Sequence, residues 1–230
     1  MSARKFTAIE TFADSSSRSR GATRKRTMVD ARPFPRPDLE QLAKESAGCE
    51  RCSLYAHATQ VVFGEGPAHA PVMFVGEQPG DQEDRSGRPF VGPAGGVLDA
   101  ALQKAGLARS QSYVTNVVKH FKWEPQGKRR LHKHPNRHET EQCRWWLDRE
   151  LLAVDPKIVV ALGAFAASAL MRRPVVLLRE RGRLLQWADG RDGLATIHPS
   201  AVLRAPDSAA RAQMLQNLIA DLKVVASLAA

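Results

Sequence analysis

The sequence predicts a single α/β domain, doubly wound around a central, mainly parallel sheet of four strands. Short apolar runs alternate with segments of helical spacing, and this alternation is typical of parallel sheets with helical crossovers. The first run, Val72–Gly76, is apolar throughout, as expected of a strand that helices cover on both faces. We expect the domain to span residues 37–230.

The elements follow one another in order along the chain. Further strands are expected over Tyr113–Val118, Ile158–Leu162 and Leu194–Ile197. Helices are expected over Asp38–Ala47, Pro93–Ala105, Glu139–Val154, Ala164–Met171 and Ser208–Ala226. A proline in the first turn and a glycine after the last residue delimit the second helix, and apolar residues three and four apart define the last. The segment Val175–Trp187 fits either a hairpin or an irregular connection.

The chain is strongly basic, with a formal net charge of +10 and a pI near 10.0. Residues 1–35 hold eight Lys/Arg and three Asp/Glu, which is half of that charge. We expect residues 1–36 to be a disordered tail, because a Ser- and Arg-rich segment has little apolar surface to bury. Much of the remaining charge lies between Tyr113 and Arg137 and favours a polyanionic partner, with nucleic acid the first candidate.

No apolar run reaches the roughly 18 residues that a membrane span needs. The N-terminus also lacks the apolar core of a signal peptide. We therefore expect a cytoplasmic protein, placed in a bacterial cytoplasm or nucleoid, without a membrane partner.

Three cysteines and a histidine form a candidate metal site. Cys49 and Cys52 are a Cys-x-x-Cys pair, which in an intracellular protein more often indicates metal or redox chemistry than a disulfide. Cys143 adds a third thiol, and His120 is the candidate for the fourth ligand. The set suits a structural zinc, and it also suits an iron–sulfur cluster in which imidazole replaces one thiolate.

Polar segments follow three of the expected strands: Glu77–Gly96, the stretch from Asn116 onward, and His198-Pro-Ser200. Ligands of open α/β sheets bind beyond the carboxyl ends of the strands, so the three segments should converge. Each segment also has a plainer interpretation. Glu77–Gly96 also fits a glycine-rich connection, and Lys128–Lys133 fits a basic loop that binds phosphate. His198 also fits a core histidine whose hydrogen bonds are made within the protein.

Taken together, these segments resemble the uracil-DNA glycosylase superfamily, and within it the iron–sulfur family 4. The matching motifs occur in family order: Cys49-x-x-Cys52, Gly76-Glu-Gln-Pro-Gly80, Pro89-Phe-Val-Gly-Pro-Ala-Gly95, Tyr113-Val-Thr-Asn-Val-Val-Lys119, Cys143 and His198-Pro-Ser200. The resemblance covers about residues 45–225. It implies the uracil-DNA glycosylase fold and a [4Fe–4S] cluster on Cys49, Cys52, His120 and Cys143, with zinc as the alternative.

Two departures from ordinary family 4 are similar to the UdgX branch, which excises uracil and stays covalently attached to the DNA sugar. His120 stands where members usually have cysteine, and an insertion carries Lys128-Arg-Arg-Leu-His132. Gln78 in the first motif also matches the branch. The chain differs in Leu131, where isoleucine is usual, and in a short insertion before Lys128.

The resemblance implies which residues bind the substrate. Phe90 would stack on the uracil ring, and Asn116 would bond the polar edge of the base. Gln78 and Asp81 would add further contacts. Arg130 would bind a phosphate and hold the loop over the site.

The resemblance also implies three catalytic residues. His198 would stabilise the departing uracil anion, and Glu77 would stabilise the cationic sugar or accept a proton. His132 would attack C1′ in place of water and leave a persistent adduct, because a neutral imidazole is a nucleophile. We expect His134, two residues on, to be solvated or to face a phosphate.

The implied partner is uracil-containing DNA, single-stranded rather than duplex, and we expect the protein to act as a monomer. Two alternatives stay open at this point. One is a conventional family 4 glycosylase that releases uracil and turns over. The other is a non-catalytic, zinc-stabilised DNA-binding module that uses the basic loop and the tail.

Overall fold

Five strands form the central sheet of the computed structural model, which describes residues 36–229. In spatial order they are β2 (Ser112–Asn116), β1 (Val72–Gly76), β5 (Ile158–Leu162), β7 (Asp192–Thr196) and β6 (Leu184–Gln186). The first four are parallel, and β6 pairs antiparallel with β7 at the edge. The expected tail, apart from Arg36, lies outside the described residues.

The sequence predicted four strands, and the observed sheet has one more. The additional strand, β6, lies in Val175–Trp187, and its antiparallel pairing with β7 is the hairpin that was one of the two interpretations. A short helix, α6 (Leu177–Glu180), precedes it. The strand has only three residues, none of them fully buried, so its sequence lacks the apolar run that marks the central strands.

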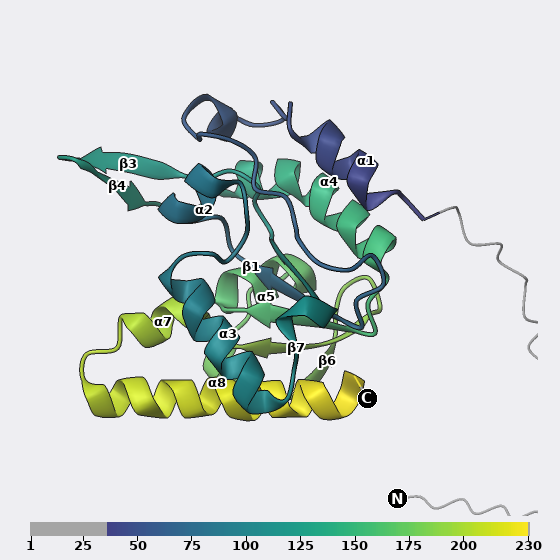
Figure 1. Cartoon of the computed structure of the whole chain (residues 1–230), viewed down its shortest axis with the longest axis vertical. Helices are drawn as coiled ribbons and strands as arrows, with labels where there is room; N and C mark the ends of the chain where they lie inside the picture. Colours follow the sequence, from purple (N-terminus) through teal and green to yellow (C-terminus); the bar gives the residue numbers. More distant parts are fainter. Residues whose placement is uncertain (1–35, 230) are drawn as a thin grey trace, which may run out of the picture. The chain divides into compact units, whose positions relative to one another are not determined.

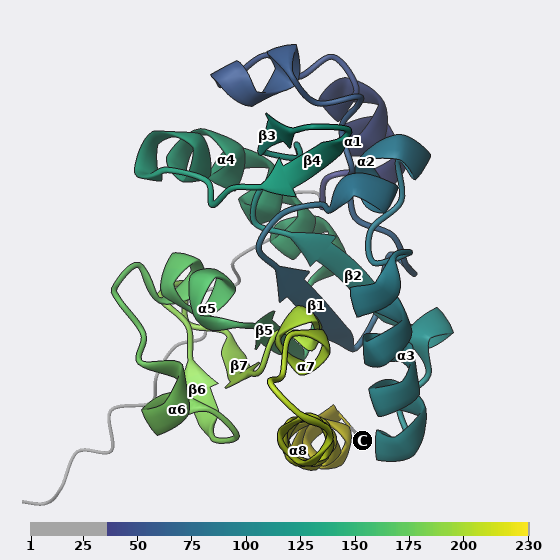
Figure 2. The same cartoon turned by 90° about the vertical axis from the view of Figure 1, so that its left-hand side faces the viewer.

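Helices cover both faces of the sheet (Figures 1 and 2). Side chains alternate along each strand, so in β1 Met73 and Val75 face one core while Val72 and Phe74 face the other. The first core is completed by α1 (Leu39–Ser46), α4 (Arg137–Val154) and α5 (Ala164–Met171). The second is completed by α3 (Pro93–Ala105) and α8 (Ser208–Ala229). In the part of the chain that the structure describes, no helix has the length and apolar character to cross a membrane.

The expected helices agree with the structure to within about three residues at each end. The main difference at a helix start is α4, which begins at Arg137 rather than Glu139. A capping box explains this: Asn136 Oδ1 accepts from the Glu139 amide, and the Glu139 carboxylate accepts from the Asn136 amide.

Several short elements that were not expected lie at the carboxyl-end edge of the sheet. The helix α2 (Asp81–Ser86) begins after Gly80, and α7 (Pro199–Leu203) begins after His198. The basic loop contains a two-stranded hairpin, β3 (Trp123–Gln126) and β4 (Arg129–His132), with Gly127 at φ 59° in its turn. Figure 1 shows this hairpin projecting from the body of the molecule beside α2.

Candidate active site

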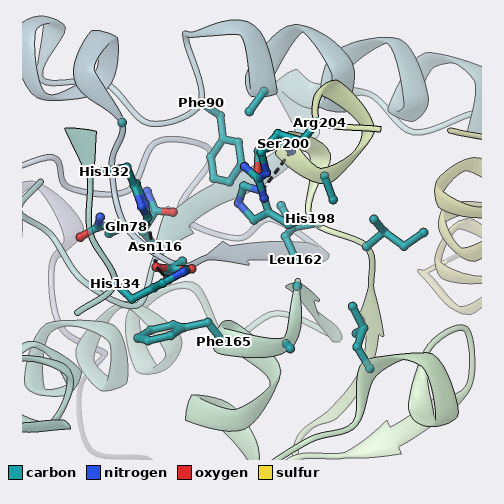
Figure 3. Close-up of a pocket in the computed structure, with 18 of the residues that line it drawn as sticks. Gln78, Phe90, Asn116, His132, His134, Leu162, Phe165, His198, Ser200 and Arg204 are labelled. Carbon is teal, nitrogen blue, oxygen red and sulfur yellow. Dashed lines mark hydrogen bonds and ion pairs between the residues drawn. The ribbon is translucent and has the colours of Figure 1, made fainter. Parts of the chain in front are cut away.

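A cavity of about 1070 Å³ opens beyond the carboxyl ends of the parallel strands (Figure 3). All three polar segments contribute to its walls, as the strand order led us to expect. The structure brings together Glu77, Phe90, Asn116 and His198, together with His132 from the end of β4. These side chains come from positions spread over 122 residues of sequence, so the sheet topology is what assembles them.

The floor of the cavity is built by close approach of side chains to β1. Gly76 pairs with Asn116 in the parallel register, and a Cβ at Gly76 would lie 2.3 Å from Asn116 Oδ1 and 2.6 Å from Phe90 Cζ. Only glycine leaves room for both groups. Asn116 is 2% exposed, and its Oδ1 has no hydrogen-bond partner among residues 36–229. A buried acceptor without a partner is a site for a ligand's donor group.

Phe90 adopts a left-handed backbone conformation with φ 53°, which is unfavourable for an aromatic residue. Its ring is buried and lies 6.0 Å from the His198 ring, centroid to centroid, at 32°. A strained backbone that presents an aromatic face to a cavity is typical of a binding site.

The hydrogen bonds of His198 define its tautomer. The Ser200 amide donates to His198 Nδ1 at 3.1 Å, and the Ser200 hydroxyl lies 2.7 Å from the same nitrogen. Nδ1 is therefore the acceptor, and the neutral ring carries its proton on Nε2. Burial lowers the pKa of His198 to about 4, and the positive charge of Arg204 acts in the same direction. His198 is thus a neutral donor at physiological pH.

Glu77 lies between two histidines of the hairpin end. Its Oε1 is 2.7 Å from His134 Nδ1 and 3.9 Å from His132 Nε2. Desolvation at the cavity wall lowers the pKa of His132, although the Glu77 carboxylate opposes this shift. His132 is 43% exposed and His134 79%. His134 is thus solvated, as expected, but it also contacts the carboxylate nearest to His132.

Gln78 joins the two ends of the hairpin rather than presenting its amide to the cavity. Its Nε2 donates to the carbonyls of Lys133 (2.9 Å) and Lys122 (3.3 Å), and its Oε1 accepts from the Lys122 amide (3.1 Å). The side chain lines the cavity wall, but these bonds use its donors. Gln78 thus positions the hairpin in this structure, and its expected substrate contact stays a prediction.

Arg130 and Asp81 form an ion pair beside the cavity. The Arg130 guanidinium pairs with Asp81 and with the fully buried Asp84, and it lies over the rings of Phe121 and Trp123 at 5.3 and 5.4 Å. Neither Arg130 nor Asp81 lines the cavity. A buried carboxylate needs a paired cation, so Asp84 holds Arg130 against α2. The phosphate contact expected of Arg130 and the substrate contact expected of Asp81 stay predictions.

Arg204, which the sequence analysis did not single out, is the cation that lines the cavity. It caps α7 and lies near His198 and His132, since its charge lowers the pKa of both. Within residues 36–229 it forms no ion pair with a carboxylate. The sequence could have indicated Arg204 as a cavity residue, because it lies six residues after His198. A short helix that follows a strand keeps its last turn near the carboxyl-end edge of the sheet.

The four expected metal ligands lie in buried segments that meet behind the hairpin: Cys49, Cys52, His120 and Cys143. The Trp146 indole donates to Cys49 Sγ and the Lys119 amide to Cys143 Sγ, both at 3.1 Å. Burial raises the pKa of Cys143 to about 12, and His120 Nδ1 is a buried nitrogen without a partner among the described residues. Buried thiols and an orphaned imidazole fit a metal group that would stabilise the thiolates.

The spacing of these ligands bears on the kind of metal group. Among residues 36–229, the one group of three or more potential ligands within 4.8 Å of each other is Glu77, His132 and His134. A single zinc ion with Zn–S bonds of about 2.3 Å would hold its sulfurs within roughly 4 Å of one another. Both zinc and an iron–sulfur cluster stay candidates for Cys49, Cys52, His120 and Cys143.

A buried ion pair lies next to the metal site. Lys119 Nζ pairs with Glu150, and both side chains are fully buried. Lys119 Nζ also donates to Thr115 Oγ1 (2.7 Å) and to the Asn116 carbonyl (2.6 Å), while Glu150 accepts from the Tyr113 hydroxyl (3.0 Å). This network fixes the backbone of β2 directly behind Asn116.

Comparisons with known proteins agree with this geometry. The family model described as the uracil DNA glycosylase superfamily matches residues 63–223. The chain is 34% identical to the type-4 uracil-DNA glycosylase of Thermotoga maritima over 80% of this chain and 94% of that protein. It is 38% identical to the type-4 enzyme of Pyrobaculum aerophilum (74% and 86%) and 34% identical to that of Archaeoglobus fulgidus (83% and 92%). The family model and these relatives together show that the chain belongs to the uracil-DNA glycosylase superfamily.

Proposed function

We propose that this protein excises uracil from DNA and remains covalently bound to the abasic sugar through His132. The observation that carries the proposal is the position of His132 at the rim of the cavity, beside Glu77 and opposite Asn116, Phe90 and His198 (Figure 3). The type-4 relatives support uracil excision. Retention on His132 is our inference from this geometry and from the UdgX-like motif.

The base would be read at the floor of the cavity. A flipped uracil would stack on Phe90 and meet Asn116, whose unpartnered Oδ1 would accept from the N3–H of the base. The amide nitrogen of the same side chain is a donor for a uracil carbonyl. Cytosine lacks the N3 proton, so the buried oxygen of Asn116 would disfavour it.

Cleavage breaks the C1′–N1 bond and leaves its electron pair on uracil. The Nε2–H of neutral His198 is a preorganised donor for that negative charge. Glu77 lies where its carboxylate can stabilise the developing positive charge on the sugar. Both groups are held before substrate arrives, which is the requirement for electrostatic stabilisation.

The new bond forms between a nitrogen of His132 and C1′. One nitrogen of the neutral ring supplies the lone pair, and the proton on the other nitrogen passes to Glu77 or to solvent. The lowered pKa keeps His132 neutral at physiological pH. The product is an uncharged N-alkylated imidazole, which is a poor leaving group, so each protein molecule would react once.

Cys49, Cys52, His120 and Cys143 would hold a [4Fe–4S] cluster, with zinc the alternative. Such a cluster would cross-link the segment after α1, the start of the hairpin and α4. The buried thiols and the unpartnered His120 Nδ1 support this assignment. Its role would be structural, since the ligands lie behind the hairpin rather than in the cavity.

Arg204 would add a phosphate contact at the cavity wall. It lies on the cavity wall and has no carboxylate partner among the residues that the structure describes. We propose that the natural substrate is single-stranded, since flipping a base from a single strand avoids the cost of unpairing. We further propose that the protein acts as a monomer.

A denaturing gel tests the covalent step. Cluster-loaded protein mixed with single-stranded uracil DNA should give a heat-resistant, shifted band, and His132→Ala should remove it. His138→Ala is the matched control, because His138 is an exposed histidine on α4 outside the cavity. A shifted band with His132→Ala would mean that the nucleophile is another residue. Several abasic products per protein molecule and no shifted band would instead establish the conventional, turning-over glycosylase.

A further inference from the structure

The hairpin end carries a group of side chains whose chemistry the glycosylase reaction does not fully use. Glu77 Oε1, His132 Nε2 and His134 Nδ1 all lie within 4.8 Å of one another. The carboxylate oxygen is 2.7 Å from one imidazole nitrogen and 3.9 Å from the other. The two rings are nearly perpendicular, at 82°, with centroids 5.5 Å apart. The three potential ligand atoms therefore lie close together on side chains of different orientation.

We propose that Glu77, His132 and His134 form a binding site for a divalent transition-metal ion such as Zn²⁺, and that its occupancy blocks the reaction of His132. Two imidazoles and one carboxylate are a ligand set that binds zinc with a fourth position left open for water. Mg²⁺ and Ca²⁺ prefer oxygen ligands and are disfavoured. Among divalent first-row ions, Cu²⁺ and Zn²⁺ should bind more tightly than Mn²⁺.

The ligands are held in place before any metal arrives. His132 ends β4 and His134 follows one residue after Lys133, whose carbonyl accepts from Gln78 and whose amide donates to the Lys122 carbonyl (3.0 Å). These bonds fix the backbone between the two histidines. Bringing the three atoms to the spacing of a coordinated ion requires side-chain movements of about 1 Å, within the reach of rotamer adjustment.

The site is also open to solvent and distinct from the expected cluster. His134 is 79% exposed and His132 43%, so an ion can enter without opening the fold. Glu77 contributes a negative charge that favours a cation. The positive charge of the nearby Arg204 limits the affinity for a metal ion, but Arg204 is not within ion-pair distance of Glu77 and leaves its carboxylate accessible. None of the three ligands belongs to the set around Cys143.

Metal binding and the reaction of His132 exclude each other. A neutral imidazole has a single lone pair, so a His132 ring that coordinates metal through one nitrogen carries its proton on the other and has no nucleophilic nitrogen left. The ion would also occupy Glu77 and add positive charge where the sugar cation must form. Inhibition rests on the proposed function, whereas binding itself does not.

Binding is tested first, without DNA. ZnCl₂ is titrated into the full-length, cluster-loaded protein by calorimetry, and we expect one site that His134→Ala weakens at least tenfold. His138→Ala should bind as the unaltered protein does, since His138 is exposed but outside the triad. Equal Zn²⁺ affinity in His134→Ala and the unaltered protein would overturn the site.

Inhibition is tested separately, with the visible absorbance of the cluster followed in the same samples. Zn²⁺ should slow uracil-DNA adduct formation in the unaltered protein and in His138→Ala, EDTA should reverse the effect, and the absorbance should stay constant. His134→Ala, compared with its own rate in the absence of zinc, should be slowed far less. Inhibition that persists in His134→Ala, or that follows loss of cluster absorbance, would contradict a block at the triad. Zinc binding without a covalent adduct would disprove the proposed function and leave the metal site standing.

Discussion

The two ends of the stretch from Lys119 to His134 have opposite environments. At the start, Lys119 is fully buried against Glu150, and His120 is buried as well. At the end, His132 and His134 are on an exposed hairpin and share one carboxylate. The start is held by contacts in the core, whereas the hairpin is held mainly by polar contacts, among them those of Gln78 and Arg130. A reactive side chain can thus be accessible to DNA and still be precisely placed if the base of its hairpin is fixed.

The largest difference between the ends should appear in stability. Lys119→Met leaves Glu150 buried and unpaired, which should cost about 3–5 kcal/mol and lower the melting temperature by on the order of 10 °C. Lys133→Met removes the exposed ion pair with Glu124 and should cost less than about 1 kcal/mol. Thermal unfolding of both variants under the same conditions is the measurement. Similar melting temperatures would show that the buried end is not the stronger anchor.

The second effect concerns the attachment of the hairpin. Arg130→Ala removes the ion pairs with Asp81 and Asp84, so His132 should lose its position, and adduct formation should slow by about 10- to 100-fold. Arg129→Ala is the matched control, because Arg129 is an exposed neighbour on the same strand without an ion pair among the described residues. Single-turnover rates at saturating DNA separate this effect from binding. An equal loss in both variants would indicate that positive charge, rather than positioning, is what Arg130 supplies.

A smaller effect is expected on DNA affinity. Arg204→Ala should weaken binding of single-stranded uracil DNA by about tenfold and reduce the salt dependence by about one phosphate contact. Arg211 is an exposed arginine on α8 outside the cavity and serves as the control. Arg211→Ala should change the affinity and the salt dependence less than Arg204→Ala does. Binding titrations of both variants at several salt concentrations, made on His132→Ala protein so that no adduct forms, provide the comparison. An unchanged salt dependence in Arg204→Ala would remove it from the DNA interface.

The smallest effect is the pH dependence of the exposed end. The pKa of His132 is lowered, so its neutral, reactive form should persist below pH 6.5, and His198 with a pKa of about 4 should stay neutral over the same range. The adduct rate should therefore change less than about twofold between pH 8 and 6.5 and decline only at lower pH, since a histidine at its ordinary pKa would already be half protonated at 6.5. Rapid-quench rates across pH 5 to 8 measure this. A midpoint at or above 6.5 would contradict the desolvated environment of His132.

The sequence predicted the parts of the fold that bury apolar side chains continuously. Val72–Gly76 and Ile158–Leu162 are buried at every position, and their apolar runs indicated both strands with the correct bounds. Pro93 and the glycine after Ala105 likewise delimited α3. The hairpin β3–β4 was missed because it is exposed, contains Pro125 and lacks alternating apolar residues. What holds it is a set of ion pairs that join residues far apart in sequence.

The same distinction applies to the site. Convergence of Glu77, Asn116 and His198 was predictable, because parallel strands end at one edge of the sheet. The positioning role of Arg130 was not, since Asp81 and Asp84 precede it by more than 40 residues and α2 was not expected. Composition makes an arginine in a basic loop a candidate for a phosphate contact. Only the structure shows that Arg130 is paired with two carboxylates, one of which, Asp84, is fully buried.

Lys119 forms hydrogen bonds through both its backbone and its side chain. Its backbone amide donates to Cys143 Sγ, and its ammonium group donates to the Asn116 carbonyl. A single residue therefore connects the sulfur that would bind the proposed metal group with the backbone of the residue that would read the base. If the proposed cluster forms, loss of iron would leave the Cys143 thiolate without its metal, and a shift of Cys143 would pass through Lys119 to the Asn116 backbone. Specific activity should then follow iron content rather than protein mass, so a preparation with half of its iron would behave as a mixture of two populations rather than as a uniformly weaker enzyme.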